Sequence, residues 1–123
     1  MKIQIIGAQS KQINYRHNPK IETWGLNGIR FKWVKQWDRM FNLHMRKHLE
    51  EEWTEGLMQD IEWANKNKNC KFYVCDKWDD VKHAIIFPRK KMNYFPRPNY
   101  HCGSFDWLIA FAIHEKVKEM ILS

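Results

Sequence analysis

The amino-acid sequence predicts a single α/β domain with an open, mostly parallel sheet and flanking helices. Short apolar segments of strand length alternate with helical patterns, which is typical of this class. The chain has 123 residues, of which 44% are hydrophobic, so it has the size and the apolar content of one domain. No repeat, low-complexity segment or linker divides it. We therefore expect residues 1–123 to fold as one unit.

Three candidate strands lie in the first part of the chain. The first is rich in isoleucine and ends at Gly7, Asn27-Gly28 closes the second, and the third ends in His44. Polar residues therefore follow each strand. The expected strands are residues 2–6, 22–27 and 39–44.

A helix is predicted from Glu50, where the pattern of the sequence changes. Apolar residues recur there at helical spacing: Trp53, Leu57, Ile61 and Ala64. Three acidic residues, Glu50 to Glu52, stand where the N-terminal end of a helix dipole favours negative charge.

The remaining elements complete the alternation of strands and helices. Two further strands are expected at residues 72–75 and 84–87, and a last short one at residues 120–122. Between them, residues 88–102 hold three prolines with basic and aromatic side chains, which favours an irregular basic loop. Ser104 can then cap a largely buried helix whose apolar residues run from 105 to 113.

The composition limits the function classes. Twenty-one Lys and Arg residues against 14 Asp and Glu residues give a net charge of +7, which indicates an anionic partner. Seven tryptophans and an aromatic content of 15% exclude intrinsic disorder and supply side chains for a core or for stacking. The longest apolar run, residues 107–113, is too short to cross a bilayer, and the N-terminus does not resemble a secretory signal. We expect a cytoplasmic protein without membrane contact.

No metal site is expected from the cysteine and histidine pattern. Cys70, Cys75 and Cys102 are an odd number without the density of a disulfide scaffold, so free thiols are expected. Cys70 and Cys75 with the pair at 101–102 do not have zinc-site spacing. His44 and His48 are four residues apart, but the strand interpretation of residues 40–44 removes the helical face that such a pair needs.

The motif order resembles a known group of proteins. The sequence resembles small phage-encoded Rossmann-like proteins with WGxN and RxFxxH motifs. The segments that carry the resemblance are, in order, Trp24-Gly-Leu-Asn27, Trp37-Asp-Arg-Met-Phe-Asn-Leu-His44, and Gly103-Ser104 before an apolar helix. The layout is also distantly similar to sialyltransferase-like and pterin pyrophosphokinase-like nucleotide-binding folds. In the group the first loop usually has two glycines with a proline, where this sequence has one glycine. The group also continues beyond the last strand, so the resemblance implies a shortened binding version or a truncated chain.

The resemblance implies a pocket at the strand ends. It would be lined by residues 7–10, Asn27, Arg39, His44 and Ser104. Independently, open α/β sheets bind ligands at the carboxyl ends of their strands, and a helix N-terminus at Ser104 favours phosphate, with Arg97 adding charge. The candidate ligand-binding residues are Gln9, Ser10, Asn27, Arg39, His44, Arg97 and Ser104.

Structural roles compete with several of these assignments. His44 is either a ligand contact or a hydrogen-bonded residue at a strand end. Asn27 is either a turn residue or a residue that recognises a ring of the ligand. Ser104 is either a helix cap or a phosphate contact. Arg39 can simply pair with Asp38. The basic loop can clamp a ligand or serve as a connector.

The sequence favours binding over catalysis, because it contains no recognised catalytic constellation. We expect a phage nucleotide-binding protein that sequesters a phosphate-rich nucleotide in the host cytoplasm, such as a cyclic oligonucleotide signal of host antiviral defence, without a further cofactor. One alternative is a phosphodiesterase or nucleotide-dependent transferase with His44 as base and Arg39 or Arg97 on the phosphate. Another is a nucleic-acid-binding module. A homodimer is an assembly that would enclose a large ligand.

Overall fold

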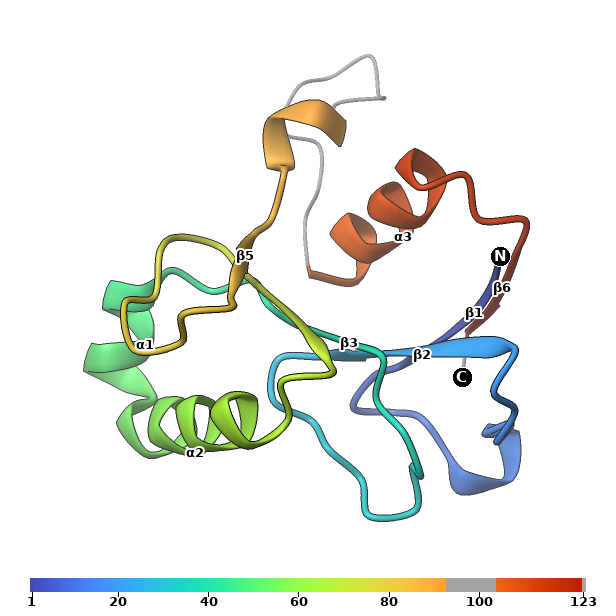
Figure 1. Cartoon of the computed structure of the whole chain (residues 1–123), viewed down its shortest axis with the longest axis horizontal. Coiled ribbons are helices and arrows are strands. Elements are labelled where there is room, and N and C mark those ends of the chain that lie inside the picture. Colours follow the sequence, from blue (N-terminus) through green and yellow to red (C-terminus); the bar gives the residue numbers. More distant parts are fainter. Residues whose placement is uncertain (93–103, 123) are drawn as a thin grey trace.

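The computed structural model describes residues 1–92 and 104–122, and these residues form an α/β fold with a six-stranded, all-parallel open sheet. The predicted fold class is therefore confirmed. The sheet order is β5-β4-β3-β2-β1-β6 (Figure 1). The strands are β1 (Lys2–Ile6), β2 (Ile21–Leu26), β3 (Arg39–Asn42), β4 (Lys71–Val74), β5 (Ile85–Ile86) and β6 (Glu119–Leu122).

The strand β1 lies inside the sheet, between β2 and β6, and pairs in parallel with both. Its isoleucines Ile3, Ile5 and Ile6 are fully buried, because helices or loops cover both faces of a parallel sheet. The chain adds strands on one side of β1 from β2 to β5 and then crosses to the other side for β6. The carboxyl ends of β1 and β6 are therefore the topological switch point of this sheet.

Three α-helices cover the two faces of the sheet in the described part of the chain (Figure 1). They are α1 (Arg46–Glu52), α2 (Thr54–Lys66) and α3 (Ser104–His114), with two short 3-10 turns, η1 (Gln12–Asn14) and η2 (Arg89–Met92). One core cluster joins α3 to the sheet through Leu108 and Phe111, and the other joins α1 and α2 through Leu49 and Leu57. Since the two clusters use different residues of the sheet, the connection through α1 and α2 passes over one face and the connection through α3 over the other.

An aromatic cluster fills the core beneath α3. The ring of Phe41 stacks on Tyr73 at 4.6 Å between ring centroids, and it also contacts Trp24, Phe87 and Phe111. Each aromatic pair of this kind adds about 0.5–1.5 kcal/mol beyond the burial of apolar area. These aromatic residues therefore serve the core.

The helix predicted from Glu50 is in fact two helices. The chain leaves helical geometry at Trp53 (φ −135°, ψ 42°), which separates α1 from α2. Leu57 and Ala64 are buried as predicted, but Trp53 is 59% exposed. Glu50 to Glu52 lie in the last turn of α1 and not in the first turn of a helix, so the dipole argument for these residues was wrong. These three glutamates therefore do not mark the start of a helix.

The strand predictions hold with changed bounds. The first strand agrees residue for residue, and the second is shifted by one position. The third ends at Asn42, so His44 lies outside it. The fifth has only two residues, Ile85 and Ile86, and both are exposed, since this strand is an edge of the sheet.

Parts of two expectations lie outside the described residues. Most of the predicted basic loop does, with Arg97 and the pair His101 and Cys102. Where the loop is described, it begins with the turn η2. No described helix is long and apolar enough to cross a membrane.

Candidate functional site

The strands β2 and β3 end side by side, and a turn follows β2. Asn27 (φ 52°) and Gly28 (φ 77°) both adopt the left-handed backbone conformation, which asparagine and glycine tolerate best. The backbone N–H of Asn27 donates to the carbonyl oxygen of Phe41 in β3 at 2.6 Å. The predicted turn at Asn27-Gly28 is confirmed, and it places Asn27 at the carboxyl edge of the sheet.

A cavity of about 260 Å³ opens at this edge, between the ends of β2 and β3 and the helices α1 and α2. It brings together two of the predicted site residues, Asn27 and His44. Small-molecule pockets typically measure roughly 300–1,000 Å³, so this cavity suits one ring system of a ligand whose remainder lies over the mouth. The lining residues are Asn27, Gly28, Arg30, Asn42, His44, Leu49, Trp53, Gly56, Leu57, Gln59 and Asp60.

A buried carboxylate, Asp60 of α2, organises the cavity wall. It is 4% exposed, and both of its oxygens accept hydrogen bonds. Oδ1 accepts from Nη1 of Arg30 at 2.6 Å and Oδ2 from Nδ2 of Asn42 at 2.8 Å. A Cβ atom at Gly28 would lie only 3.0 Å from Oδ1. Asp60 therefore ties α2 to the loop after β2 and to the end of β3, in the paired form that a buried charge requires.

The guanidinium of Arg30 is the cation of this cavity. Besides the ion pair with Asp60, it lies over the ring of Trp63 at 5.1 Å from the ring centroid, and its side chain is 17% exposed. A guanidinium has five N–H donors, and the Asp60 bond uses one of them. Arg30 can therefore donate to an anionic ligand while it remains paired.

His44 lies at the cavity mouth with its side chain exposed. Its ring is 5.9 Å from that of His48, measured between centroids, and Nε1 of Trp53 donates to Nε2 of His48 at 3.2 Å. The strand predicted to end at His44 ends at Asn42, and α1 begins only at Arg46, so the two histidines share no helical face, as expected. The short connection between β3 and α1 nevertheless brings their rings together. Within residues 1–92 and 104–122, no group of three or more His, Cys, Asp or Glu side chains could hold a metal ion.

The N-terminus of α2 forms the far rim of the cavity. No side chain caps this helix, and Gly56 in its first turn leaves open space where a Cβ would lie. Glu52 and Glu55 lie beside it. Their charges oppose the attraction of the helix dipole for an anion, so the favourable end for a phosphate is the one with Arg30 and His44.

The loop after β1 does not contribute to this cavity. Gln9 is exposed, and Ser10 is buried, with its Oγ accepting the backbone N–H of Gly7 at 2.8 Å. Ser10 thereby closes a tight turn at the switch point. These two residues therefore lie apart from Asn27 and His44, because the cavity opens beyond β2 where the helix pair α1–α2 departs.

Arg39 begins β3 and lies at the opposite edge of the sheet from His44. Its side chain donates to Glu22 at 2.8 Å, to Glu115 at 3.0 Å and to the hydroxyl of Tyr73 at 3.2 Å. Burial on its own would lower the pKa of Arg39, but the hydrogen bonds to Glu115 and Glu22 raise it overall. The predicted pairing with Asp38 does not form. Asp38 instead accepts from Gln36 and from the backbone of Thr23.

The last two predicted contacts are only partly described. Ser104 begins α3, as the sequence predicts, but its side chain lies outside the described residues, as does Arg97 altogether. Their proposed roles in phosphate binding stay predictions.

Sequence reasoning missed the central members of the cavity wall, Asp60, Arg30 and Asn42. One signal was present: Asp60 lies three residues after Leu57 and four before Ala64, on the apolar face of the helix. A charged residue on such a face must be paired, so it marks a site. Arg30 and Asn42 carry no comparable signal.

The two described cysteines differ in environment and in expected reactivity. Burial raises the pKa of the Cys70 thiol to about 12, whereas Cys75, at the other end of β4, is half-buried. Because the thiolate is the nucleophile, iodoacetamide at pH 8 is expected to alkylate Cys75 in the folded protein and to spare Cys70. Peptide mapping distinguishes the two, because Lys71 separates them. Equal labelling of Cys70 and Cys75 in the folded protein, without denaturant, would contradict the burial of Cys70.

Comparison with known proteins gave no relatives. No family model matches the chain, and no curated protein and no solved structure is significantly similar to it.

Proposed function

We propose that the carboxyl-edge cavity binds a nucleotide and that the protein sequesters it. The observation that carries the proposal is the convergence of Asn27, Asn42, His44 and Asp60 with the Arg30 guanidinium in one cavity, at the edge where parallel α/β sheets bind ligands. Amide and carboxylate groups can pair with the polar edge of a base, and Arg30 and His44 can donate to phosphate.

Trp53 supports the assignment of a base. It lines the cavity and is 59% exposed, so its ring offers a stacking surface at the mouth. With one ring inside the cavity, the phosphate groups would lie outside it, beside Arg30 and His44. A dinucleotide or a cyclic oligonucleotide has more phosphate to place there than a mononucleotide has.

Sequestration is favoured over turnover because none of the described residues that line the cavity is an activated nucleophile. Asp60 is held by two hydrogen bonds, and His44 has no carboxylate partner among the described residues. The phage origin and the role in host defence rest on the resemblance of the WGxN and RxFxxH motifs alone and remain part of the proposal.

Native mass spectrometry with a panel of mono-, di- and cyclic oligonucleotides, followed by chromatography of the released ligand, tests binding and turnover together. The proposal expects an intact nucleotide at a fixed ratio per protein. Chemically altered ligand would contradict sequestration and support the enzyme alternative. No bound nucleotide from the whole panel would contradict the proposal itself.

A histidine variant tests the location of the site. His44→Ala is expected to weaken binding about tenfold, the loss of about 1.4 kcal/mol that one hydrogen bond to a charged phosphate supplies. Isothermal titration calorimetry measures the change. His17→Ala is the matched control, because His17 is also exposed but does not line the cavity. Equal affinities of the two variants would place the ligand elsewhere.

A further inference from the structure

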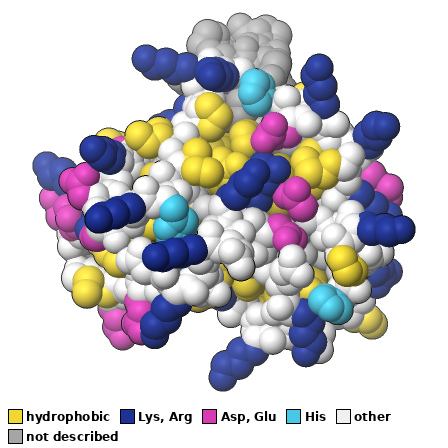
Figure 2. Space-filling view, viewed as in Figure 1, with side chains coloured by type: hydrophobic (Ala, Val, Ile, Leu, Met, Phe, Trp, Pro, Cys, Tyr) yellow, Lys and Arg dark blue, Asp and Glu magenta, His cyan; other side chains and the backbone are white. Residues whose placement is uncertain are grey.

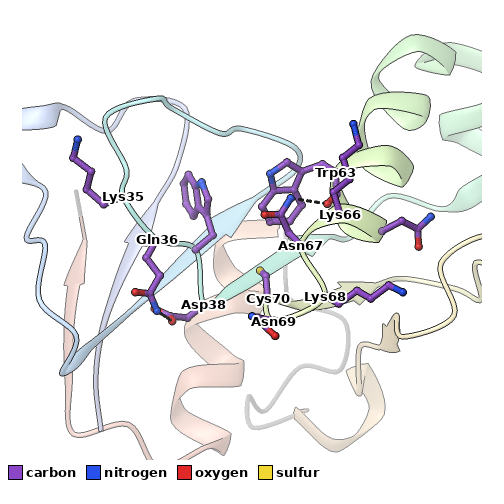
Figure 3. A pocket seen from close by; sticks show the side chains of 11 residues that line it. Lys35, Gln36, Asp38, Trp63, Lys66, Asn67, Lys68, Asn69 and Cys70 are labelled. Atoms are coloured by element: carbon purple, nitrogen blue, oxygen red, sulfur yellow. Dashed lines mark hydrogen bonds between the residues drawn. The ribbon is translucent and has the colours of Figure 1, made fainter.

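A second hollow lies at the opposite, amino edge of the sheet, where β3 and β4 begin. It measures about 550 Å³ and is larger than the carboxyl-edge cavity. Figure 3 shows Lys35, Gln36 and Asp38 on one side of it, and Trp63, Lys66 and Lys68 on the other. The first group precedes β3, and the second comes from the end of α2 and the segment that leads to β4.

The charge of this hollow is positive. Lys35, Lys66 and Lys68 line it and are exposed. Lys35 and Lys68 have no ion-pair partner among the described residues, and Lys66 pairs with Glu62, which is itself exposed. An exposed ion pair of this kind contributes little to stability, so Lys66 can exchange Glu62 for another anion. Lys and Arg side chains are also spread widely over the face seen in Figure 2, with acidic side chains between them.

The acidic residue in the hollow, Asp38, cancels only part of this charge. Both carboxylate oxygens of Asp38 are occupied, one by Nε2 of Gln36 at 2.7 Å and the other by the backbone N–H of Thr23 at 2.8 Å. Three ammonium groups against one carboxylate leave the lining of the hollow positive.

Two tryptophans supply aromatic surface inside the same hollow. Trp37 and Trp63 both line it and are half-buried. Trp37 packs against the backbone at Gly25, where an added Cβ would lie 2.7 Å from its ring. Trp63 is held by the guanidinium of Arg30 at 5.1 Å. Two rings in fixed positions beside three lysines match the pattern of stacking platform and basic rim that single-strand binders use.

We infer that this amino-edge hollow binds single-stranded nucleic acid. The lysines contact the phosphates, Trp37 and Trp63 stack on bases, and the amides of Gln36, Asn67 and Asn69 line the space where base edges would lie. Asn67 is oriented by a hydrogen bond from its Nδ2 to the carbonyl oxygen of Trp63 at 2.8 Å. The site is separate from the carboxyl-edge cavity and does not depend on the function proposed there.

Fluorescence anisotropy with labelled twelve-nucleotide dT and dA strands tests this inference on the full chain, between 50 and 200 mM salt. Binding is expected to weaken with salt, with a log–log slope near −2, since each of three contacted phosphates contributes about −0.7. The double variant Lys35→Gln/Lys68→Gln is expected to reduce the slope by about 1.4 and the affinity at low salt at least tenfold.

The matched control is Lys11→Gln/Lys20→Gln, which removes the same charge from exposed lysines outside the hollow. The inference is overturned by absence of binding at 50 mM salt, by equal losses in the two lysine double variants, or by tighter binding of a duplex of the same length. Competition by inorganic phosphate at the affinity of the strand would also overturn it, because it would indicate an anion site without base stacking.

Discussion

Replacement of Arg39 by methionine is expected to lower the free energy of unfolding by about 2–4 kcal/mol. Its side chain is 7% exposed, and its guanidinium is shared between Glu22 of β2 and Glu115, the residue that follows α3. It also lies 5.1 Å from the ring centroid of Trp24 and 5.8 Å from that of Phe111. Removing this cation leaves two carboxylates and the Tyr73 hydroxyl without their common donor. Urea denaturation followed by circular dichroism measures the loss.

Arg46→Met is the matched control for this substitution. Arg46 also makes ion pairs, with Asp80 and Glu50, and lies 5.2 Å from the ring of Trp78. Its side chain is more exposed than that of Arg39, and both of its carboxylate partners are at least 40% exposed, so a smaller loss is expected. Nucleotide affinity of the folded Arg39→Met protein should be unchanged, because Arg39 does not line the cavity. An affinity loss with unaltered stability would instead support the ligand-binding role that the sequence predicted for Arg39.

The elements that the sequence predicts well are those in which local signals and burial agree. β1 agrees residue for residue because a run of isoleucines ends at a glycine and is buried on both faces. α3 agrees because a serine precedes a nearly continuous apolar run, of which Leu108 and Phe111 enter the core. In both cases a single structure satisfies the local pattern and the packing.

The break between α1 and α2 could not be predicted from hydrophobic spacing. Leu49, Trp53 and Leu57 are spaced four apart, as on one continuous helix, yet Leu49 and Leu57 are buried and Trp53 is not. The backbone at Trp53 turns α2 away from the axis of α1, and no proline or glycine marks the position. This break exposes Trp53 at the cavity mouth, so the feature that the sequence hides is also the one that shapes the site.

The site itself was half predictable. Asn27 and His44 share a cavity because both follow parallel strands that lie next to each other, which the fold class implies. Gln9 follows β1, only one strand further on, but it does not line the cavity. Which strand ends join in a cavity depends on where the covering helices leave the sheet, and that depends on loop geometry that a single sequence does not specify.

Substitution of Asp60 by alanine is expected to lower the free energy of unfolding by about 2–4 kcal/mol and to abolish nucleotide binding at the carboxyl-edge cavity. The substitution leaves the guanidinium of Arg30, whose side chain is 17% exposed, without its carboxylate. It also leaves the amide of Asn42, a residue that is 3% exposed, without its acceptor. It also removes the only described side chain that hydrogen-bonds α2 to both the loop after β2 and the end of β3. The cavity wall should therefore loosen together with the fold.

The double variant Arg30→Met/Asp60→Ala separates charge pairing from packing. Because much of the single-variant loss comes from an unpaired charge, the double variant is expected to be destabilised less than the sum of the two single variants, with a coupling of about 1–3 kcal/mol. Thermal and urea unfolding of the four proteins measure this coupling, and titration calorimetry on the same samples measures binding. Recovery of stability without recovery of nucleotide affinity would show that Arg30 and Asp60 act on the ligand and not only on the fold. Additive losses of stability would mean that Arg30 finds water or another partner when Asp60 is removed, and the ion pair would then not be what holds α2 at the carboxyl edge.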